Sequence, residues 1–306
     1  MSASVLYDAP GPRGKALNWL YSAIALAILA WVAWIVYSKF DETGQWEADK
    51  WTPFLKSETW ENFLIPGLKG TLSAFAVGAV LALAFGFVFA VGRLSQSRFI
   101  SIPSAVVVEF FRSIPMLLLM MFIYFMQQPL GLETNVFWAV VLGLMLYNGS
   151  VLAEVIRAGV GALPKGQAEA GVAIGLSPGQ VMRTILLPQA VRSMLPAIIA
   201  QLVVLLKDTA LGFILAYSEL LNQIPKIDGN FDNLIPAAIV VALIYIALNT
   251  ILGLVANFVE ARTRRVGHTA GPVGHVAADP VAEAADLVQK GHAAGSAGGG
   301  GGGGAA

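Results

Sequence analysis

Residues 169–188, EAGVAIGLSPGQVMRTILLP, form a moderately polar stretch between two long apolar segments. The second half of this stretch predicts the start of a helix, with Ser177 as N-cap and Pro178 at the N1 position. Gln180 stands at N3, which completes a capping-box pattern with Ser177. The new helix is expected to enter the following apolar segment and to bend near its beginning at Pro188.

The residues before Ser177 predict a second, shorter helix. Leu163-Pro164 is a helix start, because a proline in the first turn lacks an N–H that would have no partner there. The helix is expected to end at Ile174, with Gly175 at the C′ position. Gly171 has no side chain and allows close approach of a neighbouring segment. Two short helices joined by a sharp turn are expected of a docking element rather than of an enzyme site.

The composition predicts an integral membrane protein. The chain is 57% hydrophobic and 12% charged, with a mean hydropathy of +0.70, whereas soluble domains average about 25% charged residues. Apolar runs of roughly 18 residues or more are typical of transmembrane helices. Six are expected, at about residues 17–37, 64–91, 103–126, 136–160, 181–206 and 234–258.

The distribution of basic residues predicts the orientation of these six spans. The segments on one side carry Arg13, Lys15, Arg93, Arg98, Arg157, Lys165, Arg183, Arg262, Arg264 and Arg265. Residues 38–63, on the other side, have six acidic residues against three lysines. The positive-inside rule therefore places both termini and the 163–188 loop in the cytoplasm, and residues 38–63 outside the cell. Residues 1–16 are read as a cytoplasmic segment, and the Ala/Gly/Pro-rich residues 267–306 as a disordered tail.

Several function classes are disfavoured. A net charge of zero argues against nucleic-acid binding. Absence of cysteine removes thiolate chemistry, and the three histidines lie in the tail, at His268, His275 and His292. The sequence also lacks a G-x₄-G-K-[S/T] phosphate-binding loop, so ATP hydrolysis would need a separate protein. We expect no enzyme activity and no cofactor bound by this chain.

Small residues recur every fourth position in the second span, at Gly70, Ala74, Gly78, Ala82, Gly86 and Ala90. Small residues at this spacing allow close contact between membrane helices. The pattern favours a tightly packed helix, against the core or a partner subunit, over a chance run in an Ala/Gly-rich chain.

Residues 169–188 resemble the E-A-A-x₃-G-x₉-I-x-L-P signature of the membrane subunits of ABC importers. The matching residues are Glu169, Ala170, Gly171, Gly175, Ile185, Leu187 and Pro188, with Gly171 standing where alanine is usual. The resemblance implies a coupling helix at about residues 163–176 that docks into a groove of an ATPase subunit. The implied coupling residues are Pro164, Gly166, Gln167, Glu169, Ala170, Gly171, Gly175, Leu176 and Ser177.

Three flanking stretches resemble motifs of the polar amino-acid permeases: EFFRSIPMLL from residue 109, YNGSVLAEVIRAGVGALPKGQAEAG from residue 147, and LPQAVRSMLPAIIAQLVVLLKDTAL from residue 187. The resemblance covers about residues 64–265 and implies an all-α type I importer core of five helices, plus an extra N-terminal helix at residues 17–37. The N-terminal region is most similar to the glutamate permeases of actinobacteria. Implied partners are an ABC ATPase dimer that carries ATP and Mg²⁺, a second permease subunit (a sister chain or a second copy), an extracellular solute-binding protein and an amino acid. Residues 38–63 and 207–233 are candidate docking surfaces for the binding protein.

Charges at membrane depth are costly and often mark pathways or paired networks. Glu109 and Arg112 are three residues apart and share a helix face, as do Glu154 and Arg157, for which a local salt bridge at the membrane edge is favoured. By resemblance, the amino-acid pathway passes near Glu109, Arg112, Ser113, Asn148, Lys207, Asp208 and Thr209. For Glu109–Arg112 and Lys207–Asp208, pathway and structural roles remain equally open, and Asn148 is equally compatible with an interhelical hydrogen bond.

Three other classes of protein fit the sequence less well. A secondary amino-acid transporter usually has more spans and inverted repeats. A membrane enzyme needs a catalytic constellation, which the spans lack. A structural or channel subunit does not need a punctuated cytoplasmic loop. Within the importer class, glutamine, aspartate or a basic amino acid is the alternative to glutamate.

Overall fold

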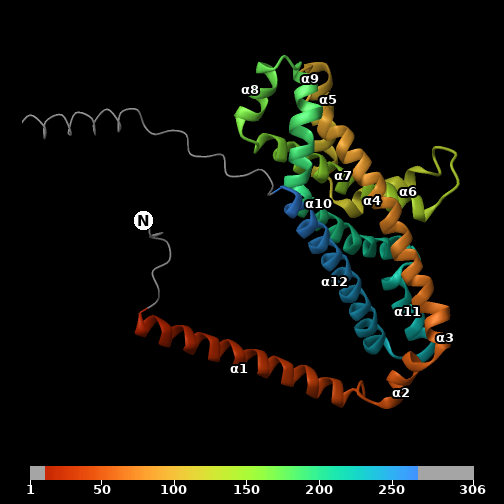
Figure 1. Ribbon diagram of the computed structural model, residues 1–306. Helices are drawn as coiled ribbons and strands as arrows, with labels where there is room; N and C mark the ends of the chain where they lie inside the picture. Colours follow the sequence, from red (N-terminus) through yellow and green to blue (C-terminus); the bar gives the residue numbers. More distant parts are fainter. Residues whose placement is uncertain (1–10, 268–306) are drawn as a thin grey trace, which may run out of the picture. The chain divides into compact units, whose positions relative to one another are not determined.

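A computed structural model describes residues 11–267, which form helices without any strand (Figure 1). The α-helices are α1 Pro12–Glu42, α2 Ala48–Trp51, α3 Ser57–Thr59, α4 Ile65–Arg93, α5 Arg98–Ser113, α6 Met116–Met126, α7 Val136–Gly161, α8 Lys165–Ala173, α9 Pro178–Val181, α10 Leu187–Asp208, α11 Leu220–Phe231 and α12 Leu234–Gly267. Short 3₁₀ segments are η1 Thr52–Leu55 and η4 Thr209–Leu215, and π-helical turns are η2 Trp60–Leu64 and η3 Met182–Leu186. Most of the predicted N-terminal segment, the disordered tail and the three histidines lie outside the described residues.

Five helical segments among the described residues are long and apolar enough to cross a membrane: Pro12–Glu42, Ser57–Arg93, Val136–Gly161, Pro178–Leu215 and Leu234–Ala256. The predicted third span at residues 103–126 is broken rather than one continuous helix. This region is the pair α5 and α6, which meet at an angle of 101°, and it makes a sixth span only if the pair is counted as one. Pro115 explains the break, because a proline disfavours helical backbone at the preceding residue, and Ile114 is extended with ψ 130°.

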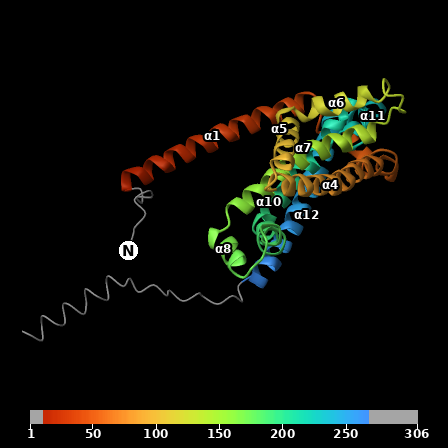
Figure 2. The same ribbon diagram turned by 90° about the horizontal axis from the view of Figure 1, so that it is seen from above.

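Helices α4, α7 and α10 contact one another and carry most of the main core (Figure 2). From Gly78 onward, the predicted stripe of small residues lies where α4 meets α7. A Cβ atom on Gly86 would lie 2.8 Å from Leu152 Cβ and 2.9 Å from the Gly149 carbonyl oxygen. Ala82 and Ala90 on the same stripe are fully buried. The stripe therefore packs within the chain, through van der Waals contact between backbones that larger side chains would separate.

We expect Gly86→Ala to destabilise the protein, because the new methyl group would press on the backbone of α7. Overpacking of this kind costs about 1–3 kcal/mol. Gly253→Ala on α12 is the matched control: nothing lies within 4 Å of its added Cβ, and alanine is favoured over glycine in a helix by up to about 1 kcal/mol. Thermal unfolding in detergent should therefore give shifts of opposite sign. Equal shifts would contradict the packing of the stripe.

The beginning of α4 packs against the segment that joins α10 to α12. This segment, residues 207–233, is the second candidate docking surface for the binding protein, and it is mostly helical, as η4 and α11. A Cβ on Gly70 would collide with the Ser218 carbonyl oxygen, and the Tyr217 hydroxyl donates to the Gly70 carbonyl oxygen at 2.9 Å. We call this region, where the start of α4 meets residues 217–218 and α11, the α11 end of the bundle. The 29 residues of α4 separate it from Arg93 and from the loop that carries α8.

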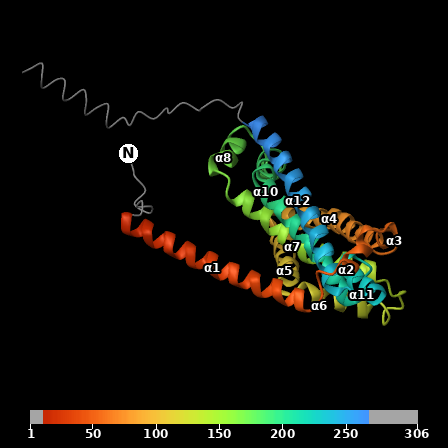
Figure 3. The same cartoon turned by 90° about the horizontal axis from the view of Figure 1, so that it is seen from below.

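A second, smaller apolar cluster forms at the α11 end. Leu220 and Ile227 of α11 pack with Leu64 and with Ala237 and Val241 of α12. Helix α11 lies beside the beginning of α12 (Figure 3). Helix α12 is thus held to the rest of the bundle through α11 near its own beginning.

Helix α1 is longer than the predicted span at residues 17–37 and buries none of its side chains. Its apolar residues are therefore available to lipid or to another subunit. A chain of aromatic contacts leads from its last turns into η1, through Tyr37–Trp46 (5.6 Å), Trp46–Trp51 (6.4 Å) and Trp51–Phe54 (6.5 Å between ring centroids). Clustered tryptophan and tyrosine are typical of a membrane–water interface.

Candidate functional site

The loop between α7 and α10 has the two-helix structure that the sequence predicts. Helix α8 ends in a Schellman motif: Leu176 N–H donates to the Gly171 carbonyl oxygen at 3.1 Å and Gly175 N–H to that of Val172 at 2.9 Å. Gly175 has the positive φ of 87° that this turn requires. Ser177 and Gln180 form the predicted capping box.

One detail of the loop differs from the prediction. Pro164 does not stand in the first turn: it is the N-cap, with extended ψ of 132°, and α8 begins at Lys165. Pro188 follows the π-helical turn η3 and stands at the start of α10. The wider turn accommodates the missing N–H of this proline.

Helix α8 is held to the chain on one side and exposed on the other. Gly171 is buried, and a Cβ there would lie 2.9 Å from Val181 Cγ2 and 2.9 Å from Ile185 Cδ1. Outward, Val172 is 57% exposed and Ile174 is 77% exposed. Most of the implied coupling residues are also exposed: Pro164, Gly166, Gln167, Glu169, Ala170, Gly175 and Ser177. The loop thus presents an apolar patch with polar residues around it, which is typical of a docking surface.

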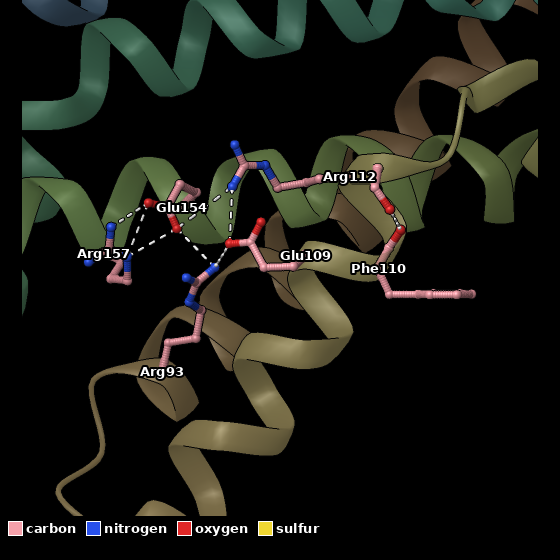
Figure 4. Close-up of polar contacts among 7 residues, drawn as sticks. Arg93, Glu109, Phe110, Arg112, Glu154 and Arg157 are labelled. Atoms are coloured by element: carbon pink, nitrogen blue, oxygen red, sulfur yellow. Dashed lines mark hydrogen bonds and ion pairs between the residues drawn. The ribbon is translucent and has the colours of Figure 1, made fainter.

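Next to this loop, five charged side chains join α4, α5 and α7 (Figure 4). Glu154 lies at the centre, with its carboxylate 2.9 Å from Arg93 Nη1, 3.9 Å from Arg112 Nη1 and 2.5 Å from Arg157 Nη2. Glu109 adds contacts to Arg93 at 3.1 Å and to Arg112 at 3.5 Å. We call these five residues the charge cluster.

Both predicted local pairs exist within the charge cluster, Glu109–Arg112 and Glu154–Arg157. Arg93, which fuses the two pairs, was not predicted as a member. Its partner Glu109 is 16 residues away, so the contact does not have the three- or four-residue spacing that predicts an ion pair within one helix. The arginine side chain is only 12% exposed, which makes its ion pairs more consequential than surface pairs.

A separate polar cluster surrounds Asn148 in the middle of α7. Its Nδ2 donates to Asp208 Oδ2 at 3.4 Å and contacts Met116 Sδ at 3.7 Å, while its Oδ1 accepts from Gln201 Nε2 at 2.6 Å. Gln201 and Asp208 are both on α10, whereas Met116 is the first residue of α6. Asn148 therefore makes the interhelical hydrogen bonds that were one of its two predicted roles, and Gln201 is a member that the sequence did not reveal.

The remaining predicted pathway residues do not join the Asn148 cluster. Ser113 Oγ donates to the Phe110 carbonyl oxygen, at the end of its own helix. Thr209 is buried and donates to the Leu206 carbonyl oxygen. Lys207 is exposed and faces a cavity beside α11 and α12. The predicted set is thus divided among the charge cluster, the Asn148 cluster and this cavity, while Ser113 and Thr209 make only local bonds within their own helical segments.

At the α11 end, Glu219 is a fully buried carboxylate that the sequence did not single out. It caps α11 by accepting from the backbone N–H groups of Leu221 and Asn222, each at 2.7 Å, and it accepts from the Tyr245 hydroxyl at 2.6 Å. Burial raises its pKa above the ordinary value of 4.5, against these hydrogen bonds, which lower it. Glu219 ties α12 to the start of α11.

We expect the protein to lose stability as the pH rises through the raised pKa of Glu219. A carboxyl group whose pKa is higher in the folded than in the unfolded chain binds more protons when folded. Its contribution is therefore complete below about pH 4.5 and is lost at higher pH. Melting temperatures between pH 4.5 and 8 should show a slope that Glu219→Gln flattens and that Glu58→Gln, an exposed control, retains. An unchanged slope in Glu219→Gln would contradict this assignment.

A bundle of apolar helices long enough to cross a membrane, with an exposed loop between two of them, defines a membrane-embedded protein. The chain belongs to the family of binding-protein-dependent transport system inner membrane components, whose model matches residues 82–265.

Its relatives include amino-acid permeases. The chain is 45% identical to the glutamate transport system permease protein GluD of Corynebacterium glutamicum over 72% of its own length and 82% of that protein. It is 33% identical to the arginine transport system permease protein ArtQ of Bacillus subtilis, over 66% of this chain and 93% of that one. A crystal structure of an amino acid ABC transporter with histidines matches with a TM-score of 0.63 and 26% identity, over 68% of this chain and 98% of the other.

Proposed function

We propose that this chain is a permease subunit of an ATP-driven importer for L-glutamate. The observation that carries the substrate assignment is the 45% identity to a glutamate permease. The relatives named for arginine and glutamine are 33% identical. Glutamine, aspartate and basic amino acids are therefore the alternatives that an uptake experiment must compare.

The loop from residue 163 to 188 is the proposed contact with a separate ATPase. Its support is geometric: the Schellman motif and the capping box hold α8 rigidly, and Gly171 fixes it against Val181 and Ile185. Val172 and Ile174 point outward, and no residue within 11–267 covers them. ATP and Mg²⁺ are expected on the ATPase, whose closure would move α8 and switch the pathway between its two openings.

In this proposal the α8 end faces the cytoplasm, as the basic residues near α4, α8 and α12 favour, and the α11 end faces the solute-binding protein. The amino acid crosses near the Asn148 cluster and the charge cluster. A second permease subunit completes the pathway, and a sister chain is favoured over a second copy by the resemblance to glutamate permeases.

The decisive experiment is uptake by the reconstituted importer, with this chain, its neighbouring permease, ATPase and binding protein in liposomes. We expect ATP-dependent uptake of L-glutamate that unlabelled glutamate competes at least about tenfold better than arginine, which corresponds to about 1.4 kcal/mol. Empty liposomes and an ATPase without hydrolytic activity are the controls. Uptake of basic amino acids alone would refute glutamate as the substrate, and uptake without ATP would refute the importer class.

A further inference from the structure

At the α11 end, two segments far apart in the chain form one surface. Residues 46–64 pack on α11 and on the turn before α12, and α2 and α3 lie beside α11 (Figures 1 and 3). Asn233 Nδ2 donates to the Lys50 carbonyl oxygen at 3.1 Å, and Lys50 Nζ lies 3.0 Å from Asp232 Oδ2. We call the surface formed by residues 46–64 and 220–233 the outer platform.

The outer platform is acidic. It carries six acidic residues against three lysines, and one of these lysines, Lys50, is paired with Asp232. Four of its carboxylates are exposed and form no ion pair within residues 11–267: those of Glu47, Asp49, Glu58 and Glu61. Such a surface attracts and orients a protein with a basic face and repels an acidic one.

The outer platform also presents an exposed leucine. Leu55 at the end of η1 is 87% exposed, whereas its neighbour Phe54 is buried. Trp60 is partly exposed, and its Nε1 donates to the Phe54 carbonyl oxygen at 2.8 Å, which holds the indole ring to η1. Unpaired carboxylates on the same surface keep it in water, because moving a charge into lipid is costly. An exposed apolar residue among polar ones, in water, is typical of a protein interface.

We infer that the outer platform docks the solute-binding protein through a basic face of that protein, with Leu55 as an apolar anchor. The inference rests on the proposed function, which supplies a solute-binding protein at the α11 end. Residues 46–64 lie outside residues 82–265, which the family model matches, so this part of the platform is an addition to the shared core. The bonds of Lys50 and Asn233 hold the two parts together before docking, which lowers the entropy cost of binding.

The first test measures the binding of purified, glutamate-loaded solute-binding protein to the complete importer in lipid nanodiscs. Glu58→Lys should raise the dissociation constant at least about fivefold at low salt, because it places a cation opposite a basic face. Salt at about 0.5 M should remove most of this difference, because exposed charges are then screened. Glu61→Lys should act in the same way. Glu133→Lys is the matched control: it makes the same charge change at an exposed position on the link between α6 and α7, outside the platform, and should bind as the wild type does.

The second test places a cross-linker at the apolar anchor. The chain contains no cysteine, so Leu55→Cys can carry a single benzophenone. Illumination should join this position to the purified solute-binding protein, and adding Glu58→Lys should reduce the yield. Leu254→Cys on α12, which is also exposed, should give no such product. The melting temperature of each variant in detergent checks that the chain has folded.

The results that oppose the inference differ from those that oppose the proposed function. Normal binding by folded Glu58→Lys and Glu61→Lys, or an equal loss in Glu133→Lys, would overturn the platform assignment. Cross-links from Leu55→Cys to lipid alone would do so as well, and would mean that the bilayer covers this leucine. In each of these cases, glutamate uptake by the wild-type importer leaves the proposed function standing. If the wild-type importer neither binds a solute-binding protein nor takes up an amino acid, the proposed function itself is refuted.

Discussion

Replacing Val172 with Asp and Ile174 with Glu should detach the ATPase from this permease and abolish uptake, while the permease itself still folds. Both side chains are exposed on α8 or at its end, so the new charges meet water in the isolated chain. In the proposed complex they would be buried against the ATPase without partners. Loss of a central interface residue costs about 2 kcal/mol or more, which corresponds to a roughly 30-fold weaker complex.

The measurement is the amount of ATPase that co-purifies with the tagged permease, together with glutamate-stimulated ATP hydrolysis. Ile174→Val keeps an apolar surface and should retain both. Leu55→Glu also places a charge at an exposed leucine, 87% exposed, but on η1 near the α11 end. It should retain the ATPase in full. Normal retention in the Val172/Ile174 variant, with uptake intact, would mean that α8 is not the coupling element.

Local sequence patterns predicted the loop well because its structure depends on local chemistry. Gly175 and the pair Ser177 and Gln180 bond to groups only a few residues away. Their roles can therefore be predicted from one short stretch of sequence. The small-residue stripe was predicted equally well, although its partner could have been another subunit and is in fact mainly α7, with Gly70 against Ser218. The break at Ile114-Pro115 carried a signal as well, but the apolar run across it outweighed the proline.

Contacts between segments far apart in the chain could not be predicted from the sequence. The sequence motifs singled out Asn148 and Asp208 but not Gln201. The Gln201 side chain reaches Asn148 only because α10 packs against α7. Lys207 and Asp208 were grouped because they are adjacent, yet helix geometry sends them to different neighbours. Glu219 lay in a segment that the sequence marked only as a candidate docking surface, and the packing of α11 against α12 buries it.

Glu154→Gln should destabilise the permease strongly, because it removes the carboxylate that three arginines share. Arg93, Arg112 and Arg157 would be left with Glu109 alone. Glu154 is 23% exposed and Arg93 12% exposed, so water compensates the loss only in part. Breaking a buried ion pair costs about 3–5 kcal/mol, and residual exposure reduces this to roughly 2–3 kcal/mol. Thermal unfolding in detergent should show a decrease of about 4–12 °C for a chain of this size.

The exposed pair Lys39–Glu42 on α1 is a matched control, since it has the same spacing of three residues as Glu154–Arg157. Glu42→Gln should cost at most about 0.5 kcal/mol. Adding Arg157→Met to Glu154→Gln should recover part of the stability, because it removes a guanidinium that has lost its partner; a purely additive double variant would contradict the shared-carboxylate geometry.

The charge cluster also bears on coupling, because Arg157 lies four residues before the end of α7, and the next helix is α8. Because the ion pairs hold α7 to α4 and α5 at this point, a movement of α8 would be transmitted to all three helices. We therefore expect Glu154→Gln, purified at low temperature where it stays folded, to retain the ATPase but to hydrolyse ATP with little dependence on glutamate.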